Sequence, residues 1–166
     1  MKASCAIRKW HVHSANVRAD FGVPLNYTPW TSRRGVTLSG ISETNARARD
    51  LIDVAWAVRL KQRQSEDLDV LAHNFFVDVS QSVHFKPWSE DGLRTFCRSS
   101  RIYSYEWDML LGAKHQMAAM GFSLRIIDML GPAKASCALV GQAFAVPSVA
   151  TAVMACALNS HAPWWQ

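Results

Sequence analysis

The chain has 166 residues, of which 49% are hydrophobic and 19% are charged, a composition that excludes a disordered tail and predicts one compact domain with a buried core. The formal net charge of +5 is compatible with a polyanionic partner such as DNA. Because the basic residues are spread along the sequence, the same charge describes an ordinary basic surface equally well.

The first predicted elements are short strands. Residues 1–40 carry only short apolar stretches, such as the one from Val17 to Val23, so we predict one or two strands joined by loops and no long helix. Several turn-forming residues divide this region: Gly22, Pro24, Pro29, Gly35 and Gly40.

A helix is predicted from Ser42 to Gln64. Apolar residues recur there at helical spacing, and Ser42 or Thr44 can provide the N-cap. The basic residues fall largely on the other side of the helical wheel, so we expect an amphipathic helix with a solvated basic face. The apolar positions are Leu51, Ile52, Ala55 and Val58, and the basic ones are Arg47, Arg49, Arg59 and Lys61.

Short helices and strands follow. A second helix is predicted to start at Ser65, and the segment from Phe75 to Val79 is predicted to form a strand. A proline and a glycine interrupt residues 80–101, which indicates a loop. A further short strand is expected from Ile102 to Tyr105, and a helix from about Leu111 to Met120 should end at Gly121.

The span from Ala138 to Leu158 contains no charged residue and approaches the ~20 residues that cross a bilayer. A tail anchor is one interpretation, and Trp164 and Trp165 would supply its interfacial pair. The span is rich in alanine and small polar residues and is split by Pro147, which favours a buried helix that begins at this proline. We therefore expect no membrane partner.

The cysteines and histidines form no metal-binding or disulfide pattern. Cys5, Cys97, Cys137 and Cys156 are far apart and include no C-x-x-C pair, and no histidine has acidic or cysteine partners at metal-ligand spacing. Charged residues interrupt the first nine positions, which leaves no secretory apolar core. We expect no metal and a reduced, nuclear or cytoplasmic protein.

The segment from Leu139 to Ala150, Leu-Val-Gly-Gln-Ala-Phe-Ala-Val-Pro-Ser-Val-Ala, resembles the closing motif of DNA cytosine-5 methyltransferases. In that family a Gly-Asn-Ala/Ser-Val-Pro loop precedes an alanine-rich helix and forms one wall of the S-adenosylmethionine pocket. The resemblance implies that Gly141, Gln142 and Ala143 contact this cofactor, with Gln142 in place of the family's asparagine. Glycine and alanine let backbone amides approach a ligand closely.

Residues 92–103, 108–116 and 120–122 resemble the preceding motif of the same family, which touches the DNA backbone. The matching residues are Thr95, Gly121 and Phe122, and the departures are Arg94, Met109, His115 and Gln116. The resemblance implies DNA contacts from Thr95, Arg98, Ser99 and Arg101. Arginine and serine are suited to phosphate contacts, which position a protein without reading sequence.

Two further segments resemble the family. Residues 19–29 open like its Tyr/Phe-Gly-Val-Pro-Gln motif, but Leu25, Tyr27 and Pro29 stand in place of the glutamine and of two arginines that act near the flipped cytosine. This departure counts against activity. Residues 77–82 resemble a segment of protist members of the group.

The motifs that perform cytosine methylation do not occur in the sequence. The reaction needs a thiolate that attacks carbon 6 of an extruded base, an acid and a bound methyl donor. The family places these in Pro-Cys-Gln, Glu-Asn-Val and Phe-x-Gly-x-Gly, and none of the three occurs among the 166 residues. We predict no catalytic residue, and two hypotheses remain: part of a methyltransferase that works with a second chain carrying the catalytic half, or a non-catalytic DNA-binding module.

The resemblance implies an α/β fold, the C-terminal portion of a Rossmann-like, S-adenosylmethionine-dependent methyltransferase with short strands and three or four helices. Residues 1–34 would end the methyltransferase sheet region, and residues 35–110 would form a reduced target-recognition region. Residues 111–166 would form C-terminal helices with the closing motif. We expect an exposed apolar face on the helix from Pro147 to Leu158, where the absent domain docks.

Overall fold

The computed structural model describes residues 2–63, 67–90, 92, 93, 97, 99–123 and 125. The chain forms two compact units. The first comprises residues 1–95 and 100–111, and the second comprises residues 96–99 and 112–166.

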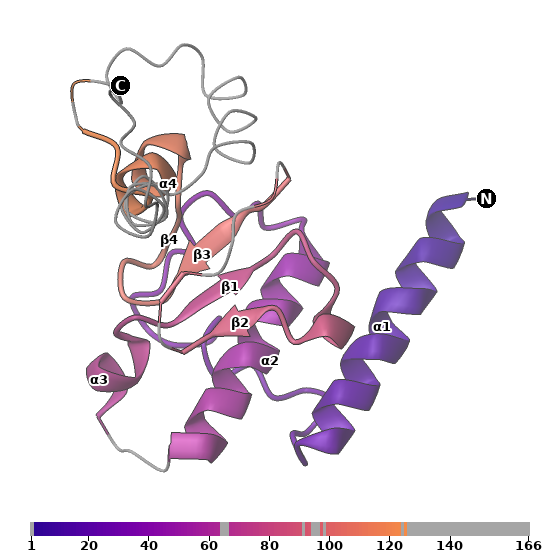
Figure 1. The fold of residues 1–166 in the computed structure, drawn as a ribbon. Coiled ribbons are helices and arrows are strands. Elements are labelled where there is room, and N and C mark those ends of the chain that lie inside the picture. Colours follow the sequence, from indigo (N-terminus) through magenta and orange to yellow (C-terminus); the bar gives the residue numbers. More distant parts are fainter. Residues whose placement is uncertain are drawn as a thin grey trace, which may run out of the picture. The chain divides into compact units, whose positions relative to one another are not determined.

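The first unit combines helices with a small antiparallel sheet (Figure 1). Its elements are α1 (Lys2–Asp20), α2 (Ala46–Arg63), α3 (Leu68–Ala72), β1 (Phe76–Asp78), the 3-10 helix η1 (Val83–Phe85), β2 (Trp88–Ser89), β3 (Ile102–Ser104) and β4 (Met109–Leu110). The strand order is β2-β1-β3-β4, and every neighbouring pair is antiparallel. The second unit has one described helix, α4 (Ala113–Ala119). The expected α/β class is confirmed, with short strands and four α-helices among the described residues.

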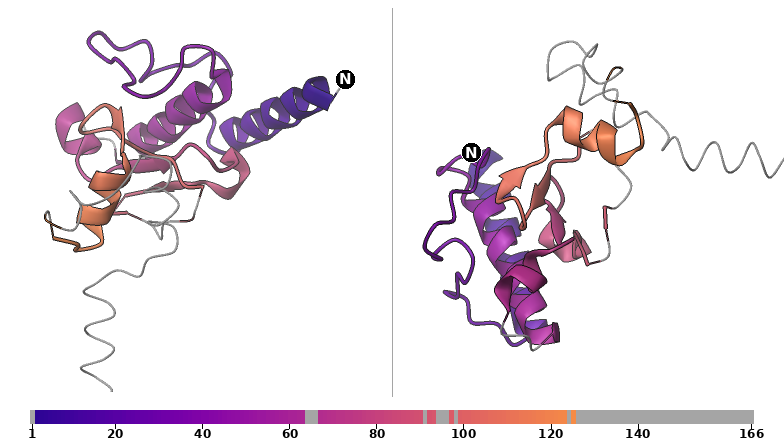
Figure 2. Two further views of the ribbon diagram at one scale, coloured as in Figure 1. Left: turned by 90° about the horizontal axis from the view of Figure 1, so that it is seen from above. Right: turned by 90° about the vertical axis from the view of Figure 1, so that its left-hand side faces the viewer.

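Helix α2 is the centre of the hydrophobic core. Every residue from Leu51 to Arg59 is buried. Trp56 is 1% exposed and packs against the rings of Phe75 and Tyr105, which flank β1 and β3. Figure 2 shows α2 lying across one face of the sheet. The helix is therefore held in place by burial on all sides rather than by a single apolar stripe.

Two expectations for α2 are wrong in detail, although the helix itself is confirmed. Asn45 rather than Ser42 or Thr44 precedes the first turn, and its side chain accepts a hydrogen bond from the N–H of Ala48 at 3.1 Å. Arg59 does not lie on a solvated basic face. It is buried, and its guanidinium lies 2.6 Å from the Glu90 carboxylate, which neutralises the charge.

The expectation of strands and no long helix near the start of the chain is wrong, because α1 occupies Lys2–Asp20. All the glycines and prolines of residues 1–40 lie at or after Gly22, so none interrupts a helix before that point. Gly22 has a φ of 59°, and the N–H of Val23 binds the carbonyl of Arg18 at 2.7 Å, which ends the helix. The described part of residues 1–34 contains no strand.

The other elements agree with the sequence in type. Helix α3 begins after Asp67, whose carboxylate accepts from two N–H groups of its first turn, whereas the predicted start, Ser65, lies outside the described residues. Strands β1 and β3 fall within the predicted strands, and α4 ends before Gly121, which has a φ of 84°. Strands β2 and β4 and η1 were not predicted, because segments of two or three residues carry too little periodicity.

Candidate functional site

Hydrogen bonds join a tight turn after β1 to the residue just before β3. The Asp78 carboxylate accepts hydrogen bonds from the N–H and hydroxyl of Ser80, at 2.9 and 2.6 Å, and from the N–H of Arg101 at 3.0 Å. The N–H of Val79 donates to the Arg101 carbonyl at 2.9 Å. Both the N–H and the carbonyl of Arg101 are therefore hydrogen-bonded, which holds in place the backbone from which its side chain extends.

The side chain of Arg47, in α2, forms hydrogen bonds with the same turn. Its guanidinium donates to the carbonyls of Val79 and Gln81, at 2.7 and 2.8 Å. A planar guanidinium suits this position because it can donate to two acceptors at once and stays charged at any physiological pH. The turn therefore carries a fixed positive charge next to Arg101.

Two of the four residues predicted to contact DNA are described. The side chains of Ser99, in the second unit, and Arg101, in the first, are exposed, and Ser100 is buried. Thr95 and Arg98 lie outside the described residues. Arginine is one of the side chains that contact phosphate oxygens, and the exposure of Arg101 is compatible with such a contact.

The sequence analysis missed the parts played by Asp78 and Arg47. An Asp-x-Ser spacing is typical of a turn in which the carboxylate accepts from the residue two positions later, and Asp78 and Ser80 carry that signal. No local signal exists for Arg47, because its acceptors lie 32 and 34 residues further along the chain.

A cavity of about 240 Å³ borders this turn on the side of α1 and α2. It is lined by Lys9, Trp10, His13, Arg47, Asp50, Leu51, Ser82 and Val83. The carboxylate of Asp50 is already bound by the guanidinium of Arg18 at 2.8 Å and by the hydroxyl of Ser14. The lining therefore offers mainly cations and apolar side chains to a ligand.

A second cavity of about 480 Å³ has a lining of both charges. Arg33 lies 3.7 Å from Asp69, and His73 lies 3.1 Å from Glu106. A third carboxylate, that of Asp108, accepts hydrogen bonds from neighbouring backbone and hydroxyl groups. Since three carboxylates line this cavity, it offers less to a polyanion than the first.

Residues 19–29, which resemble a methyltransferase motif, comprise the last two residues of α1 and the loop that follows it. The Arg18 guanidinium donates to the carbonyls of Pro24 and Tyr27, both at 2.9 Å. The side chains of Leu25 and Tyr27, which stand where the family has glutamine and arginine, are exposed. Hydrogen bonds from Arg18 thus hold the loop. Tyr27 and Pro29 occupy the two positions at which the family has arginine.

The residues predicted to contact the cofactor, Gly141, Gln142 and Ala143, lie outside the described residues, and so does the uncharged span from 138 to 158. Within the described part of the chain, no three side chains come together that could hold a metal ion. None of the helices described is sufficiently long and apolar to cross a bilayer.

No family model matches the chain, and neither does any curated protein or solved structure.

Proposed function

We propose that the chain is part of a DNA (cytosine-5) methyltransferase, in which it contacts DNA and forms one wall of the S-adenosylmethionine pocket. Gly141, Gln142 and Ala143 contribute that wall, and a second chain with a Pro-Cys-Gln nucleophile supplies the catalytic half. When bound, S-adenosylmethionine supplies the methyl group that is transferred.

The observation that supports the proposal most is a contact between two segments that resemble the family independently. Residues 77–82 lie about twenty positions before residues 100–103, yet Asp78 and Val79 bond directly to Arg101, and β1 pairs with β3. Both segments therefore belong to one structure, in which the turn after β1 is bonded to the backbone of an exposed arginine.

The described side chains have binding and positioning roles in this proposal. Arg101 neutralises a phosphate of the DNA backbone. Asp78 and Arg47 act through the backbone of the turn, which they hold in one conformation while the side chain of Arg101 meets its ligand. No described side chain is assigned to the attack on the base, since the thiolate belongs to the second chain.

Mixing the chain with a catalytic half from the same genome tests the proposal. We expect a labelled methyl group to pass from S-adenosylmethionine to cytosine in DNA in the mixture and with neither protein alone, because the nucleophile and the closing wall belong to different chains. A catalytic half with serine in place of the Pro-Cys-Gln cysteine is the control and should transfer nothing. DNA binding by the chain without methyl transfer from the mixture would instead favour a non-catalytic DNA-binding module.

A further inference from the structure

Basic side chains continue from the turn after β1 to α1. Arg47 and Arg101 share a neighbour, since the Arg47 guanidinium donates to the carbonyl of Val79 and the backbone carbonyl of Arg101 accepts from the N–H of Val79. Arg47 also lines the 240 Å³ cavity together with Lys9 and His13 of α1. These four residues, Arg101, Arg47, His13 and Lys9, are called the basic band below.

The 3-10 helix η1 lies beside the band and adds to it. The imidazole of His84 lies 5.3 Å from that of His13, measured between ring centroids. In the same helix Phe85 is 69% exposed. The surface next to the band therefore presents a second imidazole and an aromatic ring, side chains that accompany cations on nucleic-acid-binding surfaces.

Positive charge exceeds negative charge along the band. The carboxylates of Asp50 and Asp78 lie beside it. Asp50 is neutralised by Arg18 at 2.8 Å, and Asp78 is occupied by Ser80 and by the backbone of Arg101. With Arg18 counted, the four cations Lys9, Arg18, Arg47 and Arg101 outnumber these two carboxylates by two.

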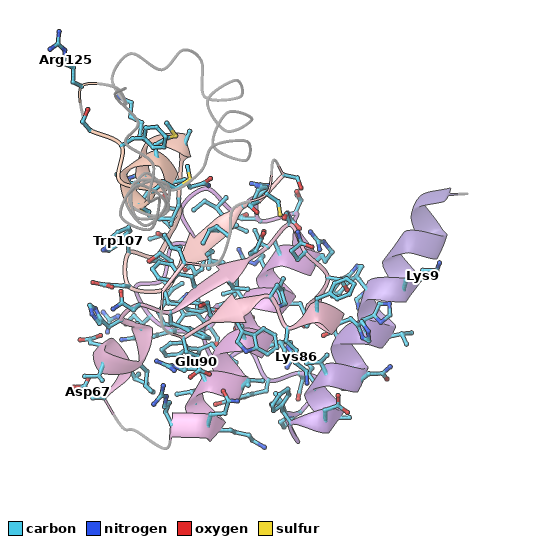
Figure 3. The ribbon with its side chains drawn as sticks, in the orientation of Figure 1. Lys9, Asp67, Lys86, Glu90, Trp107 and Arg125 are labelled. Atoms are coloured by element: carbon cyan, nitrogen blue, oxygen red, sulfur yellow. The ribbon has the colours of Figure 1, made fainter. Side chains whose placement is uncertain are left out.

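The two ends of the band are available to a ligand. Lys9 and Arg101 are exposed, and neither side chain has an ion pair or hydrogen bond within the described part of the chain. Figure 3 shows Lys9 projecting from α1. Two arginines of α2 differ in this respect, since Arg59 and Arg63 share the carboxylate of Glu90.

We infer that the basic band is a sequence-independent binding surface for the phosphate backbone of DNA, which extends from Arg101 across α2 to Lys9 on α1. This inference rests on the proposed function and enlarges its DNA contact, which the sequence placed between residues 95 and 101 alone. Cations arranged along a surface gain affinity by displacing the counterions around DNA, whatever the base sequence.

The salt dependence of DNA binding by the full chain tests the band. The variant Lys9→Ala/Arg101→Ala removes two exposed cations at its ends and disturbs no described hydrogen bond of a side chain. We expect the slope of log affinity against log salt concentration, measured between about 50 and 200 mM salt, to become shallower by about two, or one for each lost phosphate contact. Two short duplexes of unrelated sequence should show the same change.

The control variant Arg34→Ala/Arg63→Ala removes the same charge away from the band. Arg34 lines the larger cavity, and Arg63 is at the end of α2 opposite Arg47, about 24 Å along the helix axis. The control should keep the original slope. Equal slopes for the two variants would overturn the inference that the basic band binds DNA and would leave the proposed function intact. Absence of DNA binding by the unsubstituted chain at low salt would overturn both.

Discussion

Replacing Asp50 by alanine is expected to lower the free energy of unfolding by about 3–5 kcal/mol, because it leaves a buried guanidinium without its carboxylate. Arg18 is only 1% exposed, and the partners that remain to it are the carbonyls of Pro24 and Tyr27. These carbonyls accept hydrogen bonds but carry no net charge. Asp50 also accepts from Ser14, so the substitution removes two polar links between α1 and α2. Urea denaturation followed by circular dichroism measures the loss.

Two further variants separate the buried charge from the lost packing. Asp50→Asn keeps an oxygen that can accept from Arg18, so its loss should be smaller than that of Asp50→Ala. Arg18→Met/Asp50→Ala leaves no ion to be buried and should recover part of the stability lost in the single variant. A double variant no more stable than Asp50→Ala would contradict the charge explanation.

The sequence predicts the central elements of the fold because their signals are local. Helix α2 repeats apolar residues at helical spacing from Leu51 to Leu60, and the strand at Phe75 to Val79 is a run of apolar and β-branched residues. Helix α1 was missed because its described part buries only Ser14, Val17 and Arg18, too few positions to form a recognisable stripe. Polar helices of this kind are held by a few specific contacts, which periodicity does not record.

The candidate site could be predicted only in part. Resemblance to a family selected Arg101, and its exposure is compatible with the predicted phosphate contact. The frame around it comes from contacts between distant positions, since Asp78 lies 23 residues from Arg101 and Arg47 lies 32 residues from Val79. The basic band depends on the same contacts, because only the fold brings α1 next to the turn after β1.

Asp53 is the site of the second large expected effect. Its carboxylate is 1% exposed and accepts hydrogen bonds from the N–H groups of Trp30 and Thr31, both at 2.9 Å, and from the Thr31 hydroxyl. Asp53→Ala leaves these donors without their acceptor and should cost about 2–4 kcal/mol. Asp53→Asn keeps an oxygen for the two N–H groups and offers its own NH₂ to the hydroxyl, so at pH 7 it should lie within about 1 kcal/mol of the unsubstituted chain. Equal losses in the two variants would contradict this account.

The Asp53 carboxyl also makes the free energy of unfolding depend on pH, and the sign of this dependence follows from its pKa. Burial raises the pKa of the Asp53 carboxyl above its ordinary value of 3.8, although hydrogen bonds from Thr31 and Trp30 and the charge of Arg18 act in the opposite direction. The folded state therefore holds this proton more tightly than the unfolded chain, so stability is lost as the pH rises from about 4 through the raised pKa. Asp53→Asn cannot ionise and escapes that loss. Its free energy of unfolding relative to the unsubstituted chain should thus increase across this window and then level off. Urea denaturation at a series of pH values measures this difference. A difference that stays constant with pH would contradict a raised pKa for the Asp53 carboxyl.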